Sequence, residues 1–291
     1  MSALLSPTAQ RTIVRRTRGR GHGPITRLMS PGDLGQVLKP FVFLDLFQGE
    51  SSFAGGMPIH PHSGLATVTV VTEGDFRFDD AVSGEGELAY GGVEWMRAGG
   101  GVWHGKELSP GQSPRIAGFQ LWLALPPELE NGPVDSQYIE ARAMPASGPV
   151  TVILGEYAGL RSPVRAPEGV HYLLVTLQPG QAWTYAPPQG HDAAWLAVSH
   201  GQLVGPNAVA TGEMAVFGAS GTIELQASQE RSAVFVIGSA EPHPHDLVTG
   251  TYSVHTSRAA LAKGEAGIQA LAERMALRPA GPQRRTAVFS G

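Results

Sequence analysis

The chain has 291 residues, of which 16% are charged, and its formal net charge at pH 7 is -4. This length allows one large domain or two of ordinary size, and the mild charge gives no indication of binding to nucleic acid or to an anionic membrane. The absence of cysteine excludes disulfides, thiolate metal ligands and a cysteine nucleophile. No signal-peptide core or membrane-length apolar run is seen, so we expect a soluble, cytoplasmic protein with no membrane partner.

The first half of the chain has the pattern of short strands joined by tight turns. Its first 23 residues are rich in arginine and predict a solvated arm or an edge strand. The apolar segment 41–47 predicts a buried strand, and the β-branched segment 67–71 predicts another. Segment 116–125 alternates leucine and phenylalanine with other residues, which is the period of a strand.

The second half repeats this pattern after a connection. Segment 126–148, rich in proline, glycine and glutamate, is interpreted as the connection between two halves. Strands are predicted again from residue 150 to residue 237. Glu73-Gly74 and the Gly-led strand after it correspond to His200-Gly201 and the strand after that. We therefore predict an all-β protein of two tandem β-barrel or jelly-roll domains, at residues 1–130 and 131–291.

The end of the chain changes character. Ser257 is a candidate N-cap, and segment 265–277 has apolar residues at helical spacing. This pattern predicts a short helical segment that packs its apolar stripe on a barrel. The tail from Arg278 onward is expected to be loose or to return as an edge segment.

Three histidines of the first half have the pattern of a metal site. His60 and His62 stand one residue apart on a predicted strand, so both side chains point to the same side. His104 follows a glycine-rich turn about forty residues later. Three neutral imidazoles that converge from neighbouring strands would form a first-row transition-metal site. Motifs for a serine nucleophile or a phosphate loop are absent from the sequence.

The second half does not repeat this cluster. Counting back from Gly201, the positions of His60 and His62 fall on Pro187 and Gln189, neither of which replaces an imidazole. The pair His243 and His245 has the same spacing, but no third partner follows at a matching offset. We therefore expect the second half to have kept the fold and lost the metal.

The first half resembles a known family. The segments HPHSG, TVTVVTEGDFRFDD and GGVEWMRAGGGVWH, with the leading FVFLDLF, look like the N-terminal cupin domain of the pirin family. The later EPHPHDLVTGTYSVHTSRAAL resembles the segment that returns the pirin chain to its first domain. The resemblance implies a bicupin with one mononuclear metal site, usually iron, whose histidines are His60, His62 and His104.

The chain departs from the family at the fourth ligand. The pirin pattern is His-x-Glu, but Lys106 holds the glutamate position here and Glu107 lies one residue later. On a regular strand Glu107 would point to the opposite face, although Gly105 makes a bulge feasible. Ala66 stands where pirins commonly have a glutamate. The site is thus either three histidines with water, or three histidines with Glu107.

The resemblance also implies functions. Some bacterial pirins oxidise the flavonol quercetin with dioxygen, and animal pirins are associated with transcriptional regulation. We expect an Fe(II)-dependent dioxygenase of quercetin 2,3-dioxygenase type that acts on a flat aromatic substrate, with Glu107 as a ligand or as the base. Zn, Ni, Mn and Cu are the alternative metals. The alternative functions are a non-catalytic, redox-responsive protein that binds a protein partner, and a homologue whose metal site has decayed.

Trp95 and Trp103 flank the His104 turn in the sequence. They are interpreted as core residues or as the walls of an aromatic pocket.

Overall fold

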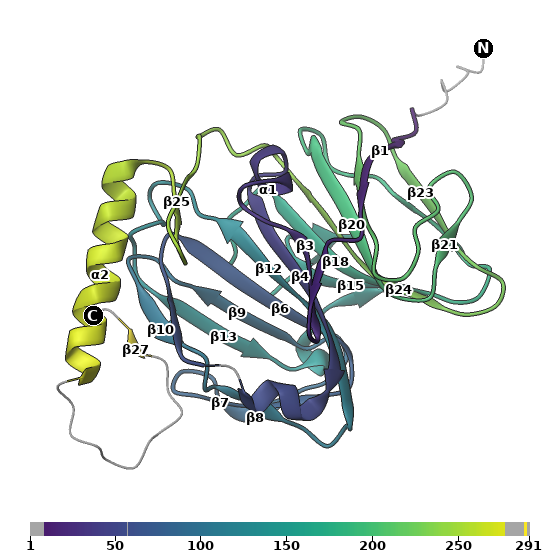
Figure 1. The fold of residues 1–291 in the computed structure, drawn as a ribbon. Coiled ribbons are helices and arrows are strands. Elements are labelled where there is room, and N and C mark those ends of the chain that lie inside the picture. Colours follow the sequence, from purple (N-terminus) through teal and green to yellow (C-terminus); the bar gives the residue numbers. More distant parts are fainter. Residues whose placement is uncertain (1–8, 57, 277–287, 290–291) are drawn as a thin grey trace.

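The computed structural model describes residues 9–56, 58–276 and 288–289, and their largest elements are two seven-stranded antiparallel sheets (Figure 1). The order of strands in the first sheet is β13 (Asp135–Ile139), β9 (Val93–Arg97), β6 (Leu65–Glu73), β12 (Arg115–Ala124), β4 (Phe41–Glu50), β3 (Ile25–Met29) and β2 (Arg20–His22). The order in the second is β1 (Ile13–Thr17), β22 (Met214–Phe217), β20 (Ala193–His200), β24 (Ala233–Ala240), β18 (Val170–Leu177), β15 (Val150–Leu154) and β14 (Ala146–Ser147).

Smaller sheets close the two barrels. On the first barrel they are β27 (Val288–Phe289), β10 (Val102–His104) and β5 (His60–His62), and then β11 (Leu108–Pro110), β7 (Phe76–Asp80) and β8 (Gly84–Leu88). On the second they are β19 (Ala182–Tyr185), β23 (Ile223–Ala227) and β21 (Leu203–Val204), with the pair β16 (Glu156–Tyr157) and β17 (Leu160–Arg161). The last pair is β25 (Val248–Thr249) and β26 (Val254–His255). The helices are α1 (Leu34–Val37) and α2 (Arg258–Ala276), with 3₁₀ turns η1 (Ser51–Gly56) and η2 (Ala141–Ala143).

The two large sheets pack against each other through one continuous apolar core. The rings of Phe41 in the first sheet and Trp195 in the second meet edge to face at 5.4 Å. Because side chains alternate along a strand, Val68 and Val70 of β6 enter this core while Thr69 points into the first barrel. Each large sheet therefore has one face in the shared core and one face inside its own barrel.

The predicted relation between the two halves is confirmed by the strand order. β6 and β20 hold the same place in their sheets, and each ends at a glycine with positive φ, Gly74 and Gly201. A Cβ at Gly74 would lie 2.1 Å from the carbonyl oxygen of Arg115, and one at Gly201 would lie 2.0 Å from that of Ser232. Both turns thus require glycine for the same reason, which is a close approach of backbone to backbone.

Equivalent residues of the two halves contact each other where the sheets meet. The hydroxyls of Thr72 and Ser199 are 2.7 Å apart, and Nε2 of His200 lies 2.9 Å from Oε2 of Glu73. Contact between equivalent positions is what an approximate two-fold relation between the barrels produces.

The strand pairing departs from the predicted domain boundary at two places. β1, from the arginine-rich start, is the edge strand of the second sheet, and β13 is the edge strand of the first. Segment 126–148 is therefore not only a connection, because its polar stretch Asp135–Ile139 pairs with β9 and completes the first sheet. An edge strand has one solvated side and shows weaker apolar periodicity than a central strand. The division at residues 130 and 131 stays a prediction.

The end of the chain returns to the first barrel, as the resemblance implied. Helix α2 lies beside β10 (Figure 1). Nε1 of Trp103 on β10 donates to the carbonyl of Ile268 on α2 at 3.0 Å. Oγ of Ser257 accepts from the amide of Ala260 at 3.1 Å, which confirms its capping role. The tail from Arg278 onward lies outside the described residues except for β27, which pairs with β10. Among the described helices, none combines the length and the apolar character needed to cross a bilayer.

Candidate metal centre

The three histidines meet on one small sheet of the first barrel. β5 and β10 run antiparallel, with His104 directly opposite His60 and Val102 opposite His62. Directly paired residues point to the same face, and His62 shares that face because it lies two residues from His60. One ligand atom from each of the three imidazoles lies within 4.8 Å of the other two. The alternation and the convergence predicted from the sequence are therefore both present.

The hydrogen bonds of His60 and His62 show which of their ring nitrogens keep a free lone pair. Nδ1 of His60 donates to the carbonyl of Pro58 at 2.9 Å, and Nδ1 of His62 donates to the carbonyl of Tyr252 at 3.1 Å. A carbonyl can only accept, so each Nδ1 holds the proton and each Nε2 keeps a free lone pair. Nε2 of His62 and Nε2 of His104 are buried and have no hydrogen-bond partner among the described residues.

Burial keeps two of the rings neutral. Loss of solvent, with a smaller effect of His60, lowers the pKa of His62 to about 3. Burial also holds the pKa of His104 well below its ordinary value, and the neighbouring His62 and His60 lower it further. Neutral imidazole is the form that binds a metal. Two buried nitrogens without a hydrogen-bond partner, in a cluster whose ligand atoms lie within 4.8 Å of one another, fit a metal ion.

Glu107 lies in the same pocket by a route that the sequence did not predict. β10 ends at His104, and Gly105 has a φ of 127°. A Cβ at Gly105 would lie 2.7 Å from the carbonyl oxygen of Pro58, so this turn requires glycine. It leaves Lys106 exposed and Glu107 buried. The inward orientation thus comes from a turn after the strand, and not from a bulge within it.

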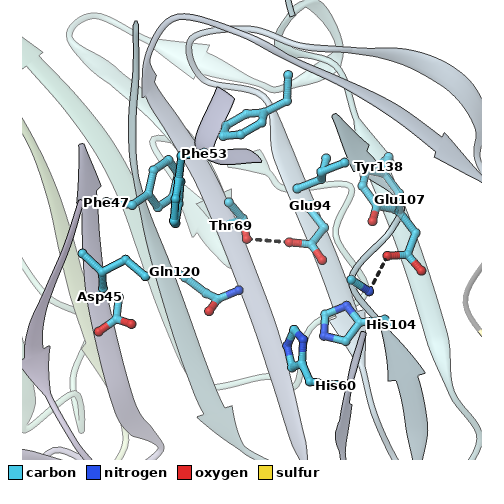
Figure 2. A pocket seen from close by; sticks show the side chains of 14 residues that line it. Asp45, Phe47, Phe53, His60, Thr69, Glu94, His104, Glu107, Gln120 and Tyr138 are labelled. Carbon is cyan, nitrogen blue, oxygen red and sulfur yellow. Dashed lines mark hydrogen bonds between the residues drawn. The ribbon is translucent and has the colours of Figure 1, made fainter. Parts of the chain in front are cut away.

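The Glu107 carboxylate is held by the backbone of this turn. Its Oε2 accepts from the amide of Gly105 at 2.8 Å (Figure 2). The same oxygen accepts from the amide of Lys106 at 2.9 Å. The three-residue group that could hold an ion consists of the histidines without Glu107. The choice between the two arrangements left open above stays a prediction.

The histidines open onto a pocket inside the first barrel. It has about 740 Å³ of empty space, which continues into solvent, and His60 and His104 are in its wall. Apolar rings line part of it, and a row of polar side chains lines the large sheet (Figure 2). The rings are Phe47, Phe53 and Phe76, and the polar row is Asp45, Gln120, Thr69 and Glu94.

Glu94 is the most perturbed carboxyl group of this pocket. It is buried, and its Oε2 accepts from Oγ1 of Thr69 at 2.5 Å. Burial raises the pKa of Glu94 to about 7, and the charges of Glu107 and Asp80 raise it further while Thr69 opposes the shift. Among the described residues, its Oε1 has no hydrogen-bond partner. Sequence reasoning missed Glu94, although a glutamate within an otherwise apolar strand is itself a signal.

The other candidates from the sequence lie elsewhere. Trp95 belongs to the core between the sheets, and Trp103 is held by helix α2, so neither lines the pocket. Nε2 of His243 bonds to the carbonyl of Leu125 at 3.3 Å. Ala66 lies in the core between the sheets, on the face of β6 that points away from the pocket.

Tandem barrels with a histidine cluster in the first define a bicupin. The pirin family model matches residues 23–123. A pirin-like protein of Caulobacter vibrioides is 38% identical over 133 residues, which is 44% of this chain and 48% of that relative. A Vibrio cholerae protein named "putative quercetin 2,3-dioxygenase" is 32% identical over 70% of this chain and 77% of its own length.

The solved structures agree with this result. A crystal structure of quercetin 2,3-dioxygenase from Acinetobacter baumannii superposes with a TM-score of 0.76 at 26% identity, covering 89% of this chain and 96% of that one. The chain belongs to the pirin family. The family resemblance and the bicupin fold expected from the sequence are confirmed.

Proposed function

We propose that the protein is a metal-dependent dioxygenase that acts on a flavonol-like aromatic such as quercetin. The observation that supports this most directly is the pair of buried, unpartnered Nε2 atoms of His62 and His104, which face His60 at the wall of an aromatic-lined pocket. Relatives named as quercetin dioxygenases give the substrate class. Fe(II) is the proposed metal, because iron is usual in the family that the chain resembles, and Zn, Ni, Mn and Cu remain the alternatives.

In this proposal His60, His62 and His104 hold the ion through Nε2. A divalent transition metal held there would supply Lewis-acid chemistry, and iron would also supply redox chemistry. The carbonyls of Pro58 and Tyr252 orient the rings through Nδ1, which is the usual second layer of support around a metal-binding histidine.

The two glutamates of the pocket divide the proton chemistry. Glu107 takes the proton of the substrate hydroxyl, and its fixed Oε2 keeps the carboxylate in one orientation. Glu94 holds a proton near neutral pH and donates a hydrogen bond from its free oxygen to a substrate oxygen. Pairs of carboxyl groups in unlike environments are the common way to separate an acid from a base.

The ring walls of the pocket position a flat substrate. Phe47 and Phe76 meet edge to face at 5.8 Å, and Phe78 stacks on Tyr138 with centroids 4.9 Å apart. Of these rings, Phe47, Phe76 and Tyr138 line the pocket and offer apolar contact area to a flat aromatic ligand.

The test is oxygen uptake after anaerobic reconstitution with Fe(II). We expect quercetin-dependent uptake by the loaded wild type, and none by the metal-free protein or by His62→Ala. Uptake no greater than that of the metal-free control would contradict the proposal. Metal binding without uptake would instead favour the non-catalytic, redox-responsive alternative.

A further inference from the structure

A row of polar side chains crosses the pocket wall and extends well beyond the histidines. Asp45 on β4 pairs directly with Gln120 on β12, Gln120 pairs with Thr69 on β6, and Thr69 pairs with Glu94 on β9. Direct partners point to the same face, so all four line the pocket. Three strand spacings separate Asp45 from Glu94, which is about 14 Å. Figure 2 shows Asp45 at the end of this row that lies away from His60 and His104.

Asp45 is a fixed acceptor at this far end. Its two carboxylate oxygens accept from Nε and Nη2 of Arg27 in a bidentate pair, the second bond at 3.1 Å. Burial raises the pKa of Asp45, and the contact with Arg27 opposes that shift. The described residues that line the pocket include no lysine or arginine, so a carboxylate on a ligand would face the Asp45 charge without a cation in the pocket wall. A hydroxyl group, which can donate, is the suitable partner.

Gln120 is the unpaired member of the row. It is half-buried, and its side-chain amide has no hydrogen-bond partner among the described residues. The amide thus offers a donor and an acceptor to the pocket, next to Asp45. An apolar ligand group placed here would leave both unsatisfied, which is costly in a partly desolvated site.

We propose that Gln120 and Asp45 form a distal hydrogen-bonding subsite, which selects neutral aromatic substrates with a hydroxyl group on the ring remote from the metal centre. This inference rests on the proposed function, because it assumes that the substrate's reacting end lies at the histidines. The side-chain amide of Gln120 forms a hydrogen bond with the remote hydroxyl, as donor or as acceptor. The Asp45 carboxylate accepts a hydrogen bond from that hydroxyl. The subsite discriminates against carboxylate-bearing aromatics and against ligands whose remote ring is bare.

The test compares the binding of two flavonols to protein loaded with Zn²⁺, which undergoes no redox change. Quercetin has two hydroxyls on its pendant ring, and galangin has the same fused ring system and a bare pendant ring. We expect wild type to bind quercetin about tenfold or more tightly than galangin. In Gln120→Leu we expect the dissociation constant of galangin to exceed that of quercetin only about twofold, because the binding of quercetin weakens and that of galangin does not.

The matched control is Gln48→Leu. Gln48 lies on β4 as Asp45 does, but on the opposite face, where its amide donates to the carbonyl of Ser199 at 3.2 Å. We expect this variant to keep the wild-type ratio. Metal content and thermal melting check that each variant is folded, and Gln120→Met provides the same comparison with a more adaptable side chain.

The two proposals fail in different ways. Equal binding of the two flavonols by wild type, or an unchanged ratio in both folded Gln120 variants, would overturn the subsite and leave flavonol oxidation intact. The absence of binding of either flavonol to loaded wild type would contradict the subsite and the proposed function together.

Discussion

The two barrels have the same strand order, but a row of polar side chains lines the first interior and apolar side chains fill the second. The correspondence of Glu73-Gly74 with His200-Gly201 places Leu196 where the first barrel has Thr69. The strand pairing then gives the equivalents of the rest of the row. Asp45, Gln120, Thr69 and Glu94 correspond to Leu173, Ile237, Leu196 and Ala215. All four of these residues belong to the apolar core of the second barrel.

The histidines differ in the same way. In the first barrel Nε2 of His62 and of His104 has no partner. In the second barrel Nδ1 of His191 bonds to Oγ of Ser239 at 2.9 Å, and the hydroxyl of Tyr185 bonds to the same Oγ at 2.8 Å. Among the described residues, the second barrel has no group of three ligand side chains that could hold a metal ion. The backbone fold therefore does not decide which barrel holds a site, and the side chains inside the barrel do.

The largest expected effect comes from removing one imidazole from the first barrel, which tests whether the metal centre lies there. We expect His62→Ala to lose stoichiometric metal, because two remaining histidines are too few to hold a transition metal tightly. Elemental analysis of the purified protein measures this. His243→Ala, from the other pair at the same spacing, should keep the metal, because Nε2 of His243 bonds to a carbonyl. Equal metal loss in both variants would show that the centre lies elsewhere.

An exchange of residues between the two rows sharpens the comparison. Ile237→Gln places an amide in an apolar core and should lower the free energy of unfolding by about 3 kcal/mol. Gln120→Leu, at the equivalent position, should change it by less than about 1 kcal/mol, because this amide is unpaired and faces a pocket. Urea denaturation measures both. Similar losses in the two variants would mean that the first barrel is as tightly packed as the second.

The smallest expected effect concerns Glu94 and pH. Its pKa is raised from 4.5 to about 7, so the folded state binds a proton more tightly than the unfolded state. The resulting stabilisation is complete below pH 4.5 and is lost as the pH rises through 7. As the pH rises from 4.5 through 7, we expect the free energy of unfolding of the metal-free wild type to fall by about 1 to 3 kcal/mol relative to that of Glu94→Gln. If the free energy of unfolding of the two proteins changed with pH in the same way, the raised pKa of Glu94 would be contradicted.

Local patterns in the sequence predicted much of the fold. The apolar run 41–47 and the alternation in 116–125 predicted the strands β4 and β12, and Ser257 predicted the start of α2. These predictions succeeded because alternation and capping depend on neighbours in the chain. Strands β1 and β13 were harder to place, because an edge strand owes its position to pairing with a distant segment.

The sequence by itself determined that His60 and His62 share a face, because side chains alternate along any strand. Only the tertiary structure decided that His104 meets them, that Gly105 turns Glu107 inward, and that the row from Asp45 to Glu94 forms one wall. Each of these depends on the register between segments that lie far apart in the chain. Register is set by the packing of the whole barrel, and no local pattern specifies it.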